Sequence, residues 1–173
     1  MKNLALGLVT VFVLLFSSVS SAQALWRGTT YGMSVQEVRA IVPEAAPVSE
    51  SGRLKDGAQE LLRVEDFELV NERFSGSFYF LSGKLTQVTL SLAKGNKHAT
   101  ASAAFNKLTE ALRSKYGKED NRKGSNNSLI KSMEAQWLSG RTNIELLLTT
   151  IGDGDASLKV VYQVRVGKEA EKL

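Results

Sequence analysis

Two nearly identical segments, LSGK at Leu81–Lys84 and LSGR at Leu138–Arg141, each lie between runs in which apolar and polar side chains alternate. A period of two residues is typical of a β-strand that buries one face. Each of the two segments thus separates two predicted strands, which strongly limits the possible folds. Ser-Gly between two alternating runs is typical of a tight hairpin turn. The alternation therefore predicts antiparallel sheet with one face packed against a core.

The residue phase around LSGK predicts the length of its turn. The apolar residues on both sides of the segment occupy even positions: Phe74, Gly76, Phe78, Phe80, Val88, Leu90 and Leu92. Residues that share a face across a hairpin must then pair with an even sum, which requires an odd loop. We expect a three-residue loop, Leu81–Gly83, with Gly83 in the left-handed conformation.

The phase around LSGR differs, because odd positions precede the segment and even positions follow it: Met133, Ala135 and Trp137, then Ile144, Leu146 and Leu148. This predicts a two-residue loop, Ser139-Gly140, with Ala135 opposite Ile144. A further hairpin is expected to turn at Gly152–Ser157. Upstream, the alternation changes phase near Glu65-Asp66, where a bulge or a turn would explain the slip.

Two helices are predicted. Ser34 and Glu37 form a capping-box pattern at the start of a short amphipathic segment that ends before Pro43. The stronger helix runs from about Thr100 to Tyr116, with Gly117 placed to cap it. The hydrophilic stretch Lys118–Ser128 after it is expected to be a loop.

The element order is a helix followed by about three strands, and then the same again. It predicts an α+β fold in which two helices pack on antiparallel sheet. One interpretation is a tandem α-βββ repeat with halves 25–95 and 96–166, within a single domain 25–166.

One short motif resembles a known family. Trp26 followed by YGMSVQEV at Tyr31–Val38 resembles the G-M-[ST]-x-x-x-V helix entry of SmpA/OmlA-type outer-membrane assembly lipoproteins. The helix-then-strands order is also similar to β-lactamase-inhibitor-like modules. The chain departs from the lipoprotein family because it has no cysteine to carry a lipid. The resemblance implies a module that binds other proteins rather than a catalyst.

The first residues have the layout of a secretory signal peptide. A basic start, Met1–Asn3, precedes an apolar run at Leu4–Phe16 and the small-residue triplet Ala22-Gln23-Ala24. We expect residues 1–24 to be removed by a cut after Ala24, with a cut after Ala22 as the alternative. The apolar run is too short for a membrane span, so we expect no stable membrane anchor and a location in a periplasm or outside the cell. The charged tail, residues 167–173, is expected to fray.

Composition argues against several function classes. The formal net charge is only +4 and the cations are mixed with acids, which is not the pattern of a nucleic-acid-binding protein. His98 is the single histidine, Asp153-Gly154-Asp155 resembles turn chemistry more than a calcium loop, and the acidic run at Glu65–Glu72 is typical of a solvated strand. The chain also lacks a nucleophile elbow and a phosphate-binding glycine loop. We therefore predict no catalytic residue, no metal and no cofactor.

Three residues are candidates for an interaction surface. Tyr79 points away from the predicted apolar face and Thr86 belongs to the neighbouring strand. Trp137 beside LSGR is either an interface anchor or buried core. The leading hypothesis is a secreted or periplasmic adaptor or inhibitor whose partner is an envelope or extracellular protein. The alternatives are a carrier of an apolar or lipid-like ligand, and, third, a cell-wall-directed hydrolase.

Overall fold

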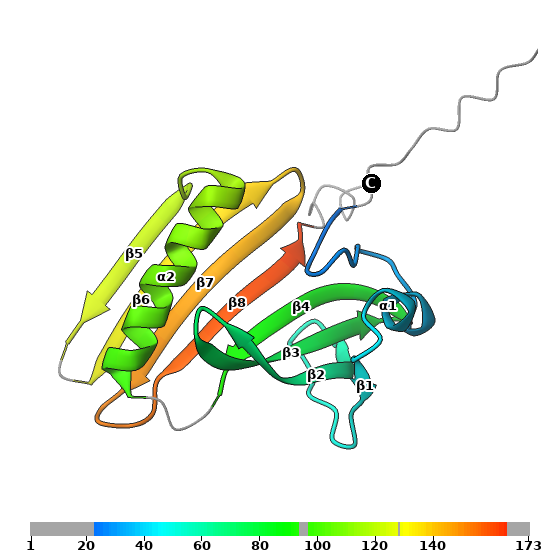
Figure 1. Ribbon diagram of the computed structural model, residues 1–173, viewed down its shortest axis with the longest axis horizontal. Helices are drawn as coiled ribbons and strands as arrows, with labels where there is room; N and C mark the ends of the chain where they lie inside the picture. The colour runs from blue at the N-terminus through cyan, green and yellow to red at the C-terminus, as the bar shows by residue number, and fades with distance from the viewer. Residues whose placement is uncertain (1–22, 94–96, 128, 166–173) are drawn as a thin grey trace, which may run out of the picture.

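The computed structural model describes residues 23–93, 97–127 and 129–165 (Figure 1). The expected signal segment up to Ala22 and the expected tail at 167–173 lie outside these residues. The helices and strands, in chain order, are α1 (Val35–Ile41), β1 (Ala46–Pro47), β2 (Gln59–Leu69), β3 (Glu72–Leu81), β4 (Lys84–Leu92), α2 (His98–Tyr116), β5 (Asn121–Asn126), β6 (Ile130–Ser139), β7 (Thr142–Ile151) and β8 (Ser157–Val164).

The strands form one antiparallel sheet of eight strands in the order β1-β2-β3-β4-β8-β7-β6-β5. The predicted α+β class is therefore confirmed. Strands β4 and β8, the last of each run, pair in the centre of the sheet, while the short strands β1 and β5 form its two edges. Figure 1 shows α2 lying across the β6–β8 half of the sheet, with α1 at the far end of the other half.

One face of the sheet carries a continuous hydrophobic core. Phe78 pairs with Val88, Val88 with Tyr162 and Tyr162 with Ile144, so their side chains point to the same side. This side packs against α2 through a buried stripe on that helix: Ala101, Ala104, Phe105, Leu108 and Leu112. The alternation of apolar residues predicted the core residues of the strands, and the helical spacing predicted those of α2.

The segment before α1 covers the other half of the same face. The Trp26 ring lies 5.0 Å from Phe67 and 5.9 Å from Phe78, measured between ring centroids. A Cβ atom built on Gly76 would lie 3.1 Å from the Trp26 ring, so the glycine allows the indole to approach the sheet. Val38 of α1 is fully buried in the same cluster.

The predicted helix caps are confirmed. The Ser34 hydroxyl accepts from the Glu37 N–H at 3.3 Å, and the Glu37 carboxylate accepts from the Ser34 N–H at 2.7 Å. Gly117 ends α2 at φ 86°, a conformation that favours glycine, and its N–H donates to the Arg113 carbonyl. α2 begins at His98, two residues before the expected start.

The bulge expected near Glu65-Asp66 is present, because the β2–β3 register shifts between Val64 and Phe67 and Asp66 has φ 51°. The expected three-residue loop of LSGK is wrong. Leu81 pairs with Lys84, and the turn is the two residues Ser82-Gly83, both with positive φ. A register shift beside Thr86 follows, because Tyr79 pairs with Gln87 but Phe80 pairs with Leu85. This shift places the apolar side chains of both strands on the same face, as their even positions predicted.

The LSGR turn has two residues, as expected, but they are Gly140-Arg141 rather than Ser139-Gly140. Ser139 pairs with Thr142, so Ala135 lies opposite Leu146 instead of Ile144. The observed pairing differs from the expected one by two residues, and a shift by an even number leaves every side chain on the same face. The alternation of apolar residues alone therefore could not determine the position of the turn. LSGK joins β3 to β4 whereas LSGR joins β6 to β7, so the two similar segments do not occupy corresponding turns of the two strand runs.

The loop predicted at Lys118–Ser128 is wrong, because Asn121–Asn126 form β5 in continuous register with β6. The side chains of β5 are exposed except at Asn121, so the strand has no buried face to produce an alternation. Pairing with β6 stabilises it instead of burial.

Candidate functional site

The face of the sheet opposite α2 is the candidate site, and we call it the open face. It is composed of three rows of paired residues that cross the sheet: Arg63, Ser77, Thr89, Val161, Glu145 and Gln136; Ser75, Ser91, Lys159, Leu147, Glu134 and Lys123; Tyr79, Gln87, Gln163 and Asn143. Among the described residues, α2 packs on the other face, where its buried stripe meets β6–β8 (Figure 1).

The polar side chains at the centre of the open face are nearly buried. Ser77, Gln87 and Thr89 are only 8%, 8% and 6% exposed, although they lie on the side opposite α2. The Gln87 amide donates to the Thr89 hydroxyl at 2.9 Å, so these polar groups partly satisfy one another. Side chains nearer the ends of the rows, such as those of Lys123 and Glu134, are more exposed, at 66% and 26%. The face therefore presents a shallow polar surface with neutral groups in the middle and charged groups around them.

A buried ion pair lies beside Tyr79 on this face. The Glu60 side chain is 3% exposed, and its carboxylate accepts from the Arg63 guanidinium at 2.6 and 2.9 Å. These hydrogen bonds raise the pKa of Arg63 further above its ordinary value. Burial raises the pKa of the Tyr79 hydroxyl, and the Glu60 charge adds to the shift. The pair holds the Arg63 guanidinium in one orientation at the surface.

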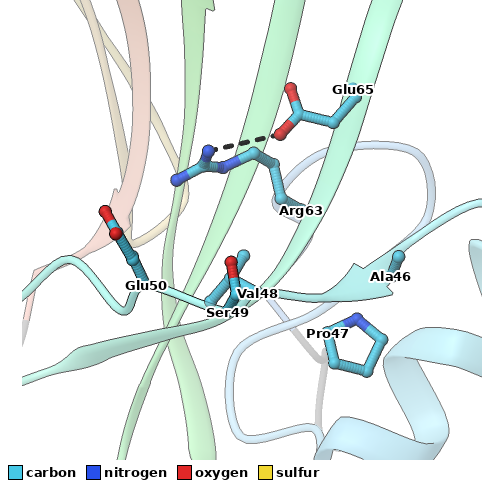
Figure 2. Close-up of a pocket in the computed structure, with 7 residues that line it drawn as sticks. All are labelled: Ala46, Pro47, Val48, Ser49, Glu50, Arg63 and Glu65. Atoms are coloured by element: carbon cyan, nitrogen blue, oxygen red, sulfur yellow. Dashed lines mark hydrogen bonds and ion pairs between the residues drawn. The ribbon is translucent and has the colours of Figure 1, made fainter.

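A groove of about 300 Å³ opens where β1 ends and the chain diverges from β2 (Figure 2). Its walls are formed by Ala46, Pro47, Val48, Ser49, Glu50, Arg63 and Glu65. The Arg63 guanidinium also donates to Glu65 at 3.2 Å, the contact drawn in Figure 2. With Glu50 and Glu65 on its walls and Glu60 already paired with Arg63, the groove carries a surplus of negative charge, which favours a cationic group of a partner.

The three sequence candidates have different outcomes. Tyr79 is half-buried on the open face, as its phase predicted. The Thr86 hydroxyl donates to the Tyr79 carbonyl at 3.3 Å, so Thr86 belongs to the irregular end of the hairpin. Trp137 is 1% exposed, and its indole N–H donates to the Gly117 carbonyl at 3.0 Å. Of its two interpretations, the structure shows buried core, and Trp137 is not an interface anchor.

The residues with weak catalytic or metal-binding patterns have structural partners. His98 Nδ1 lies 2.9 Å from the Thr150 hydroxyl, and Asp155 lies 3.9 Å from the Lys97 ammonium. Asp66 pairs with Arg73, which lowers the pKa of the Asp66 carboxyl. Within residues 23–93, 97–127 and 129–165, no group of three or more His, Cys, Asp or Glu side chains could hold a metal ion.

Sequence reasoning missed the Glu60–Arg63 pair, although a signal was present. Positions 58, 60, 62 and 64 are all buried, so Glu60 lies in the buried phase of its strand. A glutamate in that phase must find a charged partner. Arg63, three residues further along, is that partner. The register shift between Glu60 and Leu62 places the Glu60 side chain on the same face as that of Arg63, where the two form hydrogen bonds.

Comparisons of the chain with protein-family models, with curated proteins and with solved structures find no match. In the described part of the chain, neither helix combines the length and the apolar character needed to cross a membrane.

Proposed function

We propose that this protein is a non-catalytic, protein-binding module of the adaptor or inhibitor type, exported to a periplasm or to the cell exterior. The open face carries the proposal, because a sheet face that crosses from β2 to β6 opposite α2 offers a wide, preformed surface. Its polar centre and charged surroundings suit a protein partner, since polar groups at such a surface give specificity and orientation.

The export proposal is supported by the signal-like residues 1–22 and refined by contacts of the residues that follow. The Gln23 carbonyl accepts from the Tyr31 N–H at 3.0 Å, and the Ala24 carbonyl accepts from the Thr142 hydroxyl at 3.1 Å. A cut after Ala24 would remove both acceptors from the folded domain. We therefore favour the cut after Ala22, where Ser20 and Ala22 provide the small residues.

The proposal also includes a duplicated architecture with halves 25–95 and 96–166. Each half contributes a helix and then four strands, and the sheet order places β1–β4 and β5–β8 as two runs that meet at β4 and β8. Such an arrangement makes the open face a joint product of both halves. In it, LSGR corresponds to the Val70-Asn71 turn rather than to LSGK.

The alternative functions lack an observation in their favour. The groove beside Arg63 has the charged side chains of Glu50, Arg63 and Glu65 on its walls, which does not suit an apolar ligand. The residues considered for a hydrolase are Glu65, Asp66, Glu68 and His98. Of these, Glu65 and Asp66 pair with Arg63 and Arg73, and His98 lies 2.9 Å from the Thr150 hydroxyl.

Chemical crosslinking in cells that express the full chain, followed by mass spectrometry, tests the proposed function. We expect one dominant envelope or extracellular protein, crosslinked through residues of the open face. Recovery of background proteins alone under several growth conditions would contradict the proposal.

A further inference from the structure

The edge strand β5 is an unusually regular template for another strand. Its six residues pair with β6 without a register shift, from Asn121 with Gln136 to Asn126 with Lys131. The opposite edge is different, because β1 has two residues, one of them Pro47, and the exposed part of β2 contains the bulge at Asp66. Bulges, prolines and short strands protect an edge from pairing, and these features occur at the β1–β2 edge but not at β5.

The backbone groups of β5 that face outward can be identified from one hydrogen bond. The Asn127 N–H donates to the Ile130 carbonyl at 3.1 Å, which makes this pair a hydrogen-bonded one. Such pairs alternate along an antiparallel ladder, so Ser125, Lys123 and Asn121 also bond to β6. The N–H and carbonyl groups of Arg122, Gly124 and Asn126 therefore point away from the sheet.

The side chains of β5 show which ligand this edge suits. Arg122 points to the α2 side, with its guanidinium carbon 5.6 Å from the centre of the Phe105 ring. Lys123 points to the open face, and its ammonium lies 3.8 Å from Glu134. The strand contains two cations and no acid, and their ion pairs are loose, since Arg122 lies 3.6 Å from Glu119. Carboxylates on an incoming strand would complement both cations.

A groove of about 290 Å³ lies beside the same edge. Gly124 and Asn126 contribute to its walls together with Met133 and His98, which place it on the α2 side of the sheet. A residue paired with Gly124 on an added strand would direct its side chain to this side. An apolar side chain that entered the groove from that position would lie against Met133.

We propose that β5 is a docking edge for an extended, acidic peptide segment of another protein, which adds as a ninth strand beside Arg122, Gly124 and Asn126. The backbone supplies the hydrogen bonds, Arg122 and Lys123 select acidic residues, and the groove beside Met133 takes one apolar side chain. A second copy of the chain is a poorer occupant, because pairing two β5 strands would bring four cations together. Of the open-face residues, the inference involves only Lys123, so it does not rest on the proposed binding by that face.

A random-peptide display library, selected on the purified chain beginning at Gln23, tests the inference. We expect the enriched peptides to be acidic, and one of them, synthesised, to slow hydrogen exchange of the Arg122, Gly124 and Asn126 amides. The G124P variant removes an outward N–H without removing a β5–β6 hydrogen bond, and should bind that peptide at least about tenfold more weakly.

The G124A variant is the matched control. It keeps the N–H, and its added Cβ would meet only the Ser132 carbonyl at 3.5 Å, an ordinary contact. We expect G124A to bind as the natural chain does, with both variants showing the same circular dichroism spectrum. Selection of no peptide, enrichment of neutral or basic peptides, or equal binding by G124P would each overturn the inference. A concentration-dependent dimer that G124P abolishes would overturn it in favour of a second copy.

Discussion

Glu60 is a carboxylate that tolerates burial only because of a neighbouring cation. Its side chain is almost fully buried, and both of its oxygens accept hydrogen bonds from Arg63. A buried charge that loses its partner costs far more than an exposed pair contributes. The single residue pair thus stabilises the hairpin on which Tyr79 lies and orients a guanidinium at the open face.

We predict that Arg63→Met lowers the free energy of unfolding by about 3 kcal/mol, at the low end for a buried pair because Arg63 is partly exposed. Adding Glu60→Leu to this variant removes the unpaired charge and should recover most of the loss. Urea unfolding of both variants measures the effect, with Arg53→Met, an exposed residue of the same region, as the control. Equal stability of the single and double variants would contradict this explanation.

Gly76 allows the Trp26 ring to pack closely on the sheet because it has no side chain. We predict that Gly76→Ala destabilises the fold by about 1–3 kcal/mol, because the added methyl group lies 3.1 Å from the Trp26 ring and 3.4 Å from Leu90. Thermal unfolding measures the change. Ser75→Ala, at the neighbouring position on the opposite face of the strand, should change stability little, and a similar loss in that variant would argue against the packing explanation.

Among the elements, α2 packs on the sheet through its buried stripe, and an ion pair joins its last turn to the segment that follows it. Arg113 donates to both oxygens of Glu119, at 2.7 and 2.5 Å, and lowers the pKa of Glu119 to about 2. The next residue, Asp120, accepts from the Leu138 N–H at 2.7 Å. These contacts fix the path from α2 into the edge strand β5.

The pH dependence of stability follows from the Glu119 shift. A carboxyl group whose pKa is lower in the folded state stabilises the fold above its unfolded value, near 4.5, and loses that effect as the pH falls toward 2. We predict that the free energy of unfolding decreases over this range and that Glu119→Gln reduces the decrease. Urea unfolding at several pH values measures it, with Glu110→Gln on the exposed side of α2 as the control. An unchanged slope in Glu119→Gln would contradict the prediction.

The elements also show what the sequence could predict. Burial with a period of two residues identified β2, β3, β4, β6, β7 and β8, and the Ser34–Glu37 box and Gly117 identified the helix ends. Strand β5 was not predicted, because an edge strand with exposed side chains shows no alternation of apolar and polar residues. The turn at LSGK was misplaced because the register shift beside Thr86 has the same effect on residue phase as one extra loop residue. The candidate site was predicted only at Tyr79. The buried position of Glu60 in its strand indicated a charged partner, but the register shift that brings Glu60 and Arg63 together has no residue pattern of its own.

At the scale of the molecule, the described residues place the hydrophobic core on one face of a single sheet, opposite the open face. The core contains residues from both strand runs and from both helices, so the two runs stabilise each other. β4 and β8 join them through five registered pairs, from Gln87 with Gln163 to Ser91 with Lys159. The open face therefore combines side chains from both strand runs.

The start of the mature chain is a prediction for the molecule as exported. We expect the intact mass of the protein recovered from the periplasm or the medium to correspond to a chain that begins at Gln23, because Gln23 and Ala24 are hydrogen-bonded into the domain. A mass that begins at Leu25 would show that these contacts are dispensable. An uncleaved mass would contradict the proposed export.

Binding through the open face can be tested with a photo-crosslinking residue placed, one site at a time, in the full chain in living cells. Val161 and Gln163 lie near the centre of that face, and Lys115 on the exposed side of α2 is the control site. We predict that Val161 and Gln163 capture the same envelope or extracellular protein and that Lys115 does not. Capture from Lys115 alone, or no capture from the open face, would contradict the proposal that this face binds the partner.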